Sequence, residues 1–425
     1  MLKLKEFSKN FGPGLLMAAT GVGVSHIVQS VQAGANYGYT LILAIIFIHI
    51  VKYPFFLASP KYASYSKKSL LDGYYDLHPI YLVICLIFSF IMVFAMVALV
   101  FLVGSAVVAN IFTINISIEW LAIIYMIICG SILFFGRYSF LDGLIKPILL
   151  LMIVTTIIAL VIASFKFSGE PTNFVASDFG FFKKTDFLFF ISFLGWMPAT
   201  LDVAVWNSLW TAKKHENDKT PSTYKQIRLD FNAGYIITAI LAVLFVMLGK
   251  IVFYEKIADL PTKAIPFIGT FLEIYTKNLG QASYMVVAIG IFFTMFSTVI
   301  SVFDGFTRTF AHGLNILNTK ANSSAGKFKI SEKNIYNTAI LTIICGAGIV
   351  LLCFMDNMRE LVLLTTIGSF IATSIIAFLN LKISFKLSDV SKEFALSKFS
   401  KIWHYLCLAC LLTLSVCVIV AMIID

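Results

Sequence analysis

Long apolar runs dominate this sequence, and charged residues gather in the short segments between them. A run of about 20 apolar residues is long enough to cross the hydrocarbon core of a bilayer as a helix. Counting such runs predicts eleven transmembrane helices, so we expect an all-α polytopic membrane protein. The predicted spans are residues 12–32, 39–58, 79–109, 117–136, 141–165, 186–211, 231–254, 281–311, 334–354, 359–381 and 402–423.

The first predicted span contains residues that break a helix near the middle of the membrane. Gly21 and Gly23 are followed directly by the polar residues Ser25 and His26, and each interior Gly lowers helix stability by about 1 kcal/mol relative to Ala. A break in an apolar helix frees backbone groups that can bind a solute. We therefore predict a substrate site at this break. The alternative is an intact helix whose small residues allow close packing against a neighbour.

The sixth predicted span is broken in the same way. Gly195 and Pro198 lie three residues apart, and Thr200 and Asp202 follow them. Proline removes a backbone donor and clashes with the carbonyl four residues earlier, so the helix should unwind or kink here. A charged residue deep in a span costs about 2.5–3.5 kcal/mol and normally faces a transport pathway or a partner. Asp202 is therefore a second candidate site residue, unless it is a structural carboxylate paired with a hydroxyl or an amine.

Matched breaks in the first and sixth of eleven spans indicate an inverted-repeat transporter that holds its substrate between the unwound segments. The prediction is one integral membrane transporter domain, residues 1–425. It divides into a first five-helix repeat at 1–165, a second at 186–385, and an extra C-terminal helix at 402–423.

The charge distribution predicts the topology. Charged residues make up 13% of the chain, against about 25% in soluble domains. Of the 32 Lys and Arg residues, all but eight lie in the N-terminal segment and in every second loop after it. The positive-inside rule then places the N-terminus in the cytoplasm and the C-terminus outside. We expect a multi-pass protein of the plasma membrane, which in a bacterium is the inner membrane.

Other function classes find little support in the residues. The net charge of +10 falls between apolar spans, so we expect no nucleic-acid partner. The seven cysteines lie inside apolar runs, as small core hydrophobes do. The sequence carries no H-E-x-x-H, G-x-S-x-G or phosphate-loop pattern. We expect no enzyme activity, no cofactor and no obligate protein partner. The expected partners are a transported ion or small solute and the lipid bilayer.

A family resemblance rests on residues 12–39, which read G-P-G-x-L, then the Gly/Ser/His break, then Q-A-G-A-N-Y-G-Y. This pattern resembles the first span of the Nramp (natural resistance-associated macrophage protein) family of proton-coupled divalent-metal transporters. Met197-Pro198 in the sixth span resembles the start of that family's Met-Pro-His motif. The resemblance implies the leucine-transporter fold, with five plus five inverted repeats and one extra helix. It also implies a secondary active transporter of a Mn- or Fe-like divalent cation, coupled to protons.

The chain departs from that family where the metal binds. The family's first-span metal motif is Asp-Pro-Gly-Asn, and this chain reads Gly23-Val24-Ser25-His26 in the same register. In the sixth span Ala199 and Thr200 follow Met-Pro, so the histidine is missing. In another register Thr200 takes the Met position and Asp202 the His position, and both registers stay open. The lost carboxylate leaves a second hypothesis, in which the same fold carries a small organic solute such as an amino acid or an amine.

The first hypothesis gives a tentative set of metal ligands. A transition-metal site uses nitrogen or sulfur ligands with some carboxylate. His26 can supply an imidazole, Met197 a thioether and Asp202 a carboxylate. Unwound carbonyls near Gly21, Gly23 and Gly195 can complete the shell. For each of these residues the alternative is ordinary core packing.

Proton or cation coupling has its own candidates. His26 and Asp202 can titrate with substrate occupancy. Three hydroxyls in the eighth span lie on one side of a helix and can bind a coupling cation, or else hydrogen-bond between helices. They belong to Thr294, Ser297 and Thr298. His49 and Lys52 in the second span form another polar pair, for which we favour a structural role near the inner leaflet, with Lys52 extending its ammonium group to the membrane surface.

Overall fold

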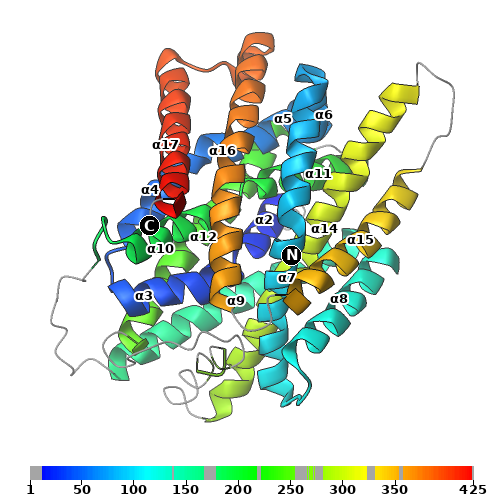
Figure 1. The fold of residues 1–425 in the computed structure, drawn as a ribbon. Coiled ribbons are helices and arrows are strands. Elements are labelled where there is room, and N and C mark those ends of the chain that lie inside the picture. The colour runs from blue at the N-terminus through cyan, green and yellow to red at the C-terminus, as the bar shows by residue number, and fades with distance from the viewer. Residues whose placement is uncertain are drawn as a thin grey trace, which may run out of the picture.

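The structure of the chain is a computed structural model, and the residues that it describes are helical except for short connections. It describes residues 12–135, 138–166, 179–217, 222–253, 266, 268–270, 272, 281–322, 331–353 and 358–423. No strand occurs in these ranges. Figure 1 shows one bundle in which helices far apart in the sequence lie side by side.

The described helices follow one another in chain order. They are α2 (Pro13–Gly21), the single π-helical turn η1 (Ser25–Ser30), α3 (Val31–Tyr37), α4 (Ile42–Phe56), α5 (Ala58–Ser66), α6 (Leu70–Leu77), α7 (Pro79–Phe112), α8 (Ile118–Phe135), α9 (Tyr138–Lys166), α10 (Lys184–Trp196), α11 (Asp202–Asn217), α12 (Tyr224–Phe253), α14 (Gln281–Asn322), α15 (Glu332–Cys353), α16 (Met358–Val390), the 3₁₀ turn η2 (Lys392–Phe394) and α17 (Lys398–Ile423).

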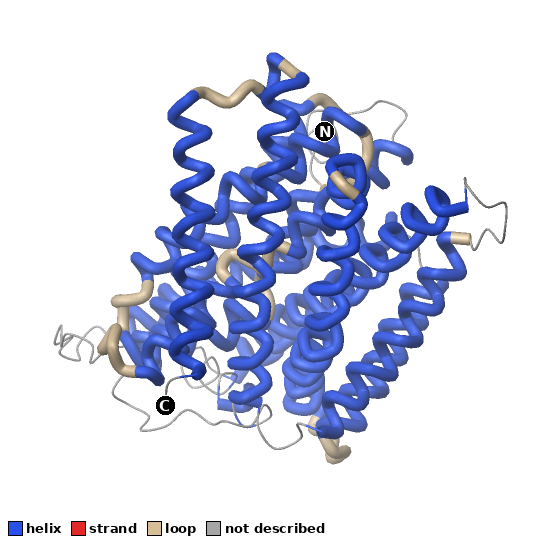
Figure 2. Tube along the Cα trace, turned by 45° about the horizontal axis from the view of Figure 1, so that its top comes forward, coloured by secondary structure: helices blue, strands red, loops and turns tan. Residues whose placement is uncertain are grey.

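The short broken helices pack against long ones. In Figure 1 α2 lies near the centre of the bundle, behind the long helices α7 and α16, and α10 lies toward the left side, below α17. Figure 2 shows the same bundle turned, with helices throughout. α2 packs on α12, α11 and α14, and α10 packs on α16. Trp206 of α11 packs edge-on against Phe306 of α14, with ring centroids 4.8 Å apart. Both broken segments are therefore positioned by long helices from other parts of the chain.

Close backbone contact fixes the first broken segment against α12. A side chain at Gly34 of α3 would lie 2.0 Å from the Val246 carbonyl oxygen, and one at Gly249 of α12 would lie 2.2 Å from the Val31 carbonyl oxygen. At the other end of the seam, a side chain at Gly234 would meet the Gly14 carbonyl oxygen at 2.1 Å. Glycine is required here because the two backbones touch, as at tightly packed transmembrane seams.

The helix lengths and compositions show a polytopic membrane protein, but they do not confirm the count of eleven spans. Within the described residues, eight helices are long and apolar enough to cross a membrane, and the bent pair of α2 with η1–α3 makes up to nine. Two predicted spans do not meet that test. In α9 the apolar part is the shorter stretch Leu149–Phe165, and the sixth span is divided between α10 and α11.

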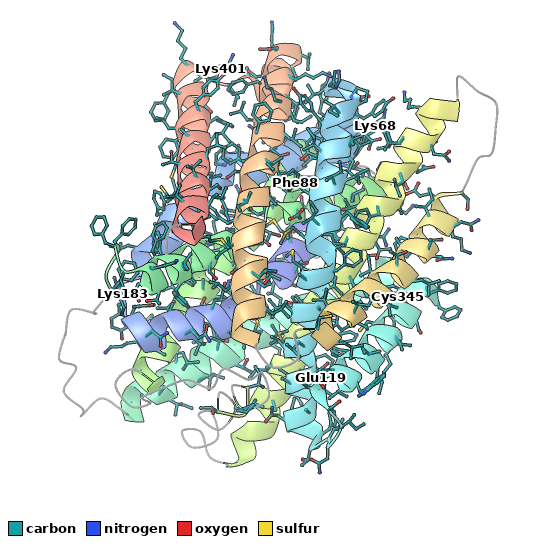
Figure 3. The ribbon with its side chains drawn as sticks, viewed as in Figure 1. Lys68, Phe88, Glu119, Lys183, Cys345 and Lys401 are labelled. Carbon is teal, nitrogen blue, oxygen red and sulfur yellow. The ribbon has the colours of Figure 1, made fainter. Side chains whose placement is uncertain are left out.

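Three labelled side chains bear on the predicted alternation of loops. In Figure 3 Lys68 and Lys401, from two loops that we predict to be cytoplasmic, lie toward the same end, in the upper part of the view. Glu119, at the start of the fourth predicted span, lies toward the opposite end. This arrangement agrees with the alternation of loops that the sequence predicts.

The glycine seam gives a first prediction. Gly249→Ala should lower the melting temperature, because the new methyl group must push α3 away from α12. Gly348→Ala is the matched control: Gly348 also lies inside a helix, but nothing lies within 4 Å of its added Cβ. There Ala should be neutral or stabilising by up to about 1 kcal/mol. Thermal unfolding of both purified variants checks this. Equal melting temperatures would contradict the close contact of α3 and α12 at Gly249.

Candidate functional site at the two helix breaks

The first span is broken where the sequence predicts. α2 ends at Gly21, η1 begins at Ser25, and the two helical segments are bent by 48°. The hydroxyl of Thr298 on α14 donates to the carbonyl oxygens of Ala19, at 3.0 Å, and Val22, at 3.3 Å. A helix end buried in a membrane needs such partners for its free carbonyls. Thr298 therefore caps the broken end of α2.

The sixth span is broken as well, and a lysine caps it. α10 ends at Trp196, and residues 197–201 are not helical before α11 begins at Asp202. The Lys52 ammonium group donates to the carbonyl oxygens of Leu194 (2.9 Å), Gly195 (2.7 Å) and Ala199 (3.2 Å). Lys52 is fully buried. Our interpretation that its side chain reaches the membrane surface was wrong, since the side chain ends inside the protein at the second break.

The two breaks meet. A side chain at Gly21 would lie 2.8 Å from the carbonyl oxygen of Pro198, so the backbones of the two broken spans are in contact. At Gly195 an added Cβ would lie 2.7 Å from the Thr366 carbonyl oxygen on α16. Gly21 therefore allows the contact between the breaks that the paired interruptions predict, and Gly195 allows α10 to pack closely on α16.

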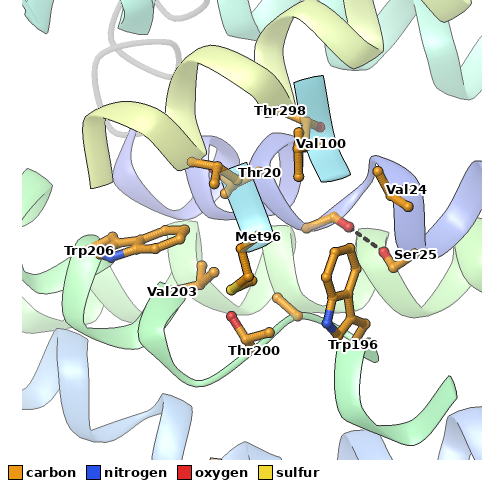
Figure 4. Close-up of a pocket in the computed structure, with 13 residues that line it drawn as sticks. Thr20, Val24, Ser25, Met96, Val100, Trp196, Thr200, Val203, Trp206 and Thr298 are labelled. Atoms are coloured by element: carbon orange, nitrogen blue, oxygen red, sulfur yellow. Dashed lines mark hydrogen bonds between the residues drawn. The ribbon is translucent and has the colours of Figure 1, made fainter. Parts of the chain in front are cut away.

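A small cavity lies between the breaks (Figure 4). Its volume is about 30 Å³, which is room for one or two water molecules. All of the lining residues are buried, so the cavity lies inside the bundle. The lining consists of Thr20, Gly21, Val24, Ser25, Met96, Val100, Trp196, Ala199, Thr200, Val203, Trp206, Thr298 and Val302.

The cavity offers hydroxyl and indole groups, and among the described residues no carboxylate lines it. The hydroxyls come from three of the predicted spans and belong to Thr20, Ser25, Thr200 and Thr298. The indole Nε1 of Trp196 is buried and has no hydrogen-bond partner in the described part of the chain. A buried donor without a partner costs about 1–3 kcal/mol. The Trp196 indole can therefore donate a hydrogen bond to a solute bound in the cavity.

His26 lies beside the cavity and does not line it. Its Nε2 lies 3.0 Å from the Thr238 carbonyl oxygen on α12, and its Nδ1 lies 2.7 Å from the Ser25 hydroxyl oxygen. The same hydroxyl oxygen lies 2.7 Å from the Gly21 carbonyl oxygen, the contact dashed in Figure 4. Ser25 thus connects His26 to the first break. A carbonyl only accepts, so Nε2 carries a proton.

Met197 and Asp202 also lie outside the lining. Met197 is fully buried. The carboxyl group of Asp202 lies at the start of α11, within hydrogen-bonding reach of the Thr200 and Ser89 hydroxyls. None of His26, Met197 and Asp202 therefore lines this cavity. In the described part of the chain, no group of three or more His, Cys, Asp or Glu side chains could hold a metal ion.

The position of the missing first-span carboxylate is occupied by α14. A Cβ added at Gly23 would lie 2.5 Å from Cγ2 and 2.6 Å from Oγ1 of Thr298. A carboxylate side chain cannot be placed at residue 23 in this arrangement without displacing the side chain of Thr298.

Of the three predicted coupling hydroxyls, one reaches a break. Thr294 donates to the Gly290 carbonyl, and Ser297 donates to the Thr294 carbonyl, so both bond within α14. Thr298 bonds to α2, as described above. The sequence interpretation missed Trp196, Thr20 and Lys52. Trp196 directly precedes Met197-Pro198, and this proximity was the available signal. Nothing in the pattern of the second span indicated that Lys52 reaches the sixth.

Comparison with known proteins identifies the fold and the family. A curated relative, an uncharacterized protein of Pasteurella multocida, is 32% identical over 382 residues, which is 88% of this chain and 84% of the relative. A manganese transporter of Eremococcus coleocola superimposes with a TM-score of 0.71 at 12% identity, covering 97% of this chain and 86% of that one. A Na⁺-coupled sialic acid symporter superimposes with a TM-score of 0.63 at 12% identity, covering 98% and 90%.

These structures share the leucine-transporter fold, so the predicted fold class is confirmed, apart from the count of helices. The sequence profile of the family described as "Natural resistance-associated macrophage protein-like" matches residues 14–421. The protein is therefore an integral membrane secondary transporter. With nearly the whole chain matched, it belongs to the Nramp family.

Proposed function

We propose that this transporter carries its cargo in the cavity between the break of α2–η1 and the break of α10–α11. The observation that carries the proposal is the contact of the two breaks beside one buried cavity. Because each broken span is two short helices, one half can tilt while the other stays packed, which would open the cavity to one side at a time.

The first candidate cargo is a divalent metal ion, such as Mn²⁺ or Fe²⁺. Family membership supports it, and the similar structure from Eremococcus coleocola is that of a manganese transporter. In this chain the groups that face the cavity are hydroxyls. Oxygen ligands suit harder ions such as Mg²⁺ and Mn²⁺ better than softer ones. His26, Met197 and Asp202 would have to turn toward the cavity in another state to bind the ion.

The second candidate cargo is a small organic solute that carries a hydrogen-bond acceptor, such as an amino acid. Two features of the cavity favour it: the unpartnered N–H of Trp196 and the absence of a lining carboxylate. A carboxylate or carbonyl oxygen of the solute would satisfy that donor. The unpartnered donor suits this cargo better than it suits a bare cation, so on the chemistry of the site we favour the organic solute. The cavity must widen to admit it, because its present volume of about 30 Å³ holds one or two water molecules.

Uptake into vesicles separates the two cargoes. The purified protein is reconstituted, and uptake of Mn²⁺, Fe²⁺ and Mg²⁺ is compared with uptake of labelled amino acids and amines. Thermal unfolding in each solute gives a second readout, because a bound solute stabilises the native state. We expect an organic solute to be taken up and to raise the melting temperature. Uptake of a divalent ion alone would establish the first candidate instead.

We also propose proton coupling through His26. The Ser25 hydroxyl has one proton to donate, and its oxygen lies 2.7 Å from both the Gly21 carbonyl oxygen and His26 Nδ1. When His26 is neutral, its Nδ1 accepts that proton, and the Gly21 carbonyl keeps the Gly23 amide as its partner, at 3.1 Å, with one lone pair available to the cargo. When His26 is charged, its Nδ1–H donates to Ser25, whose own proton turns to Gly21. Protonation of His26 would thus change which groups the first break offers.

We propose a membrane topology from the distribution of charge. The charge of the loops supports a cytoplasmic N-terminus and an external C-terminus in the plasma membrane, which in a bacterium is the inner one. The two repeats would be residues 1–165 and 186–385, with 402–423 as the extra helix. In that arrangement the broken spans are the first helix of each repeat.

Trp196→Phe tests the cargo site directly. The change keeps an aromatic ring and removes a donor that has no partner, so the stability of the cargo-free protein should not fall. Uptake should fall about tenfold, the loss of one hydrogen bond of about 1.4 kcal/mol. Trp210→Phe is the matched control. The Trp210 indole donates to Asp304 at 3.1 Å and lies outside the cavity, so this variant should lose stability while its cargo affinity stays unchanged. If Trp196→Phe lost stability and kept its uptake, while Trp210→Phe lost uptake, Trp196 would not belong to the cargo site.

His26→Gln tests the coupling. Glutamine can keep one hydrogen bond to Ser25 or to the Thr238 carbonyl, but it does not titrate. We expect cargo to exchange across the membrane still, while uptake driven by an imposed proton gradient is lost. Both are measured in reconstituted vesicles with and without a pH step. Gradient-driven uptake that equals the wild-type value would show that His26 does not carry the coupling proton.

A further inference from the structure

Lys52 stands out among the basic residues because it is wholly enclosed. Its exposed fraction is 0%, and its ammonium group lies against the unwound part of the sixth span, about 140 residues away in the sequence. Across the described residues no carboxylate lies within 4.0 Å of its Nζ, as the ion pairs there involve other residues. Its partners are backbone carbonyls only.

The number of acceptors around the amine favours its charged form. Nζ has three carbonyl oxygens within 3.2 Å, those of Leu194, Gly195 and Ala199. A carbonyl can only accept, so a hydrogen bond to each of the three uses three N–H bonds. The charged –NH₃⁺ form supplies three, whereas a neutral amine supplies two. The arrangement of the three oxygens is therefore the one that suits an ammonium group.

Such a cluster of carbonyls resembles a cation site. The end of a broken helix presents free carbonyls that carry its negative dipole end, and in transporters such ends coordinate coupling ions. Leu194 and Gly195 belong to the last turn of α10, and Ala199 belongs to the unwound segment. A free cation could bind at the point where these three carbonyl oxygens converge, but here the amine of Lys52 on α4 occupies that point.

We propose that Lys52 is a tethered cation, which takes the place of a bound ion at the second break and sets the charge beside the cargo cavity. Ala199 lines the cavity and accepts from Lys52, so the ammonium group lies one residue behind the cavity wall. A fixed positive charge at that point repels a divalent cation and attracts an anionic group. Lys52 therefore acts as a specificity-determining residue through the wall, without touching the cargo.

Chemical rescue tests the tethered cation without any knowledge of the cargo. Lys52→Ala removes the side chain beyond Cβ and leaves a space with the shape of n-propylammonium. We expect its melting temperature to fall by about 5 °C, because three buried carbonyls lose their partners. n-Propylammonium chloride should restore most of that loss, and propan-1-ol, which is similar in size but uncharged, should restore little of it.

Two further variants make the result decisive. Lys52→Met keeps the volume and removes the charge, so it should be destabilised as well and should not respond to propylammonium. Asp230→Asn is a control at the other broken span. The buried Asp230 carboxylate caps the start of α2, where it accepts from the Gly12 and Gly14 amides at 3.1 and 2.7 Å, and the substitution removes its charge. This variant should lose stability and should not be rescued by the amine.

The proposal would be overturned if Lys52→Met were as stable as the wild type, or if propan-1-ol and propylammonium restored Lys52→Ala equally. Either result would make Lys52 a space-filling residue. Because these measurements use stability and no cargo, they can fail while the transport site stands, and the transport site can fail while they succeed.

Discussion

A helix that ends inside a membrane exposes carbonyl and amide groups where no water can reach them, and the structure of this protein depends on how those groups are satisfied. At the first break the hydroxyl of Thr298 binds the carbonyls at the end of α2. At the second break the ammonium group of Lys52 binds those at the end of α10. Both caps come from helices outside the broken spans. The breaks therefore persist only in the assembled bundle.

The chemistry of the cavity follows from the same caps. Thr298 occupies the space that a side chain at residue 23 would need, and Gly23 itself brings no carboxylate to the first break. The Lys52 amine lies behind the wall at Ala199. In our proposal these two features act in the same direction, since the first leaves out a negative group and the second adds a positive one. The proposed cargo is for that reason an organic solute with an acceptor group, carried by a fold that other members of the family share.

The sequence predicts the fold better than it predicts the site. Hydrophobic runs and the glycine and proline breaks depend on local physics, so the all-α fold and both interruptions could be located from residues alone. The contacts of His26 could not: its imidazole turns to Thr238, over 200 residues away, and no local pattern encodes that choice. Lys52 shows the same limit. We predicted that its charged group reaches the membrane surface. In the structure it binds carbonyls at the end of α10 that have no partner within their own helix.

The central claim is that cargo binds where the two broken helices meet, and protection of a cysteine placed there tests it most directly. In a background without the seven native cysteines, Ser25→Cys is treated with a membrane-impermeant thiol reagent in the presence and absence of the solute that the protein takes up. Thr294→Cys, buried in α14 but outside the cavity, is the control. The account predicts that Ser25→Cys is labelled when the site opens and that saturating cargo slows the labelling, while cargo leaves the control unchanged. Labelling of Ser25→Cys at the same rate with and without cargo would contradict it.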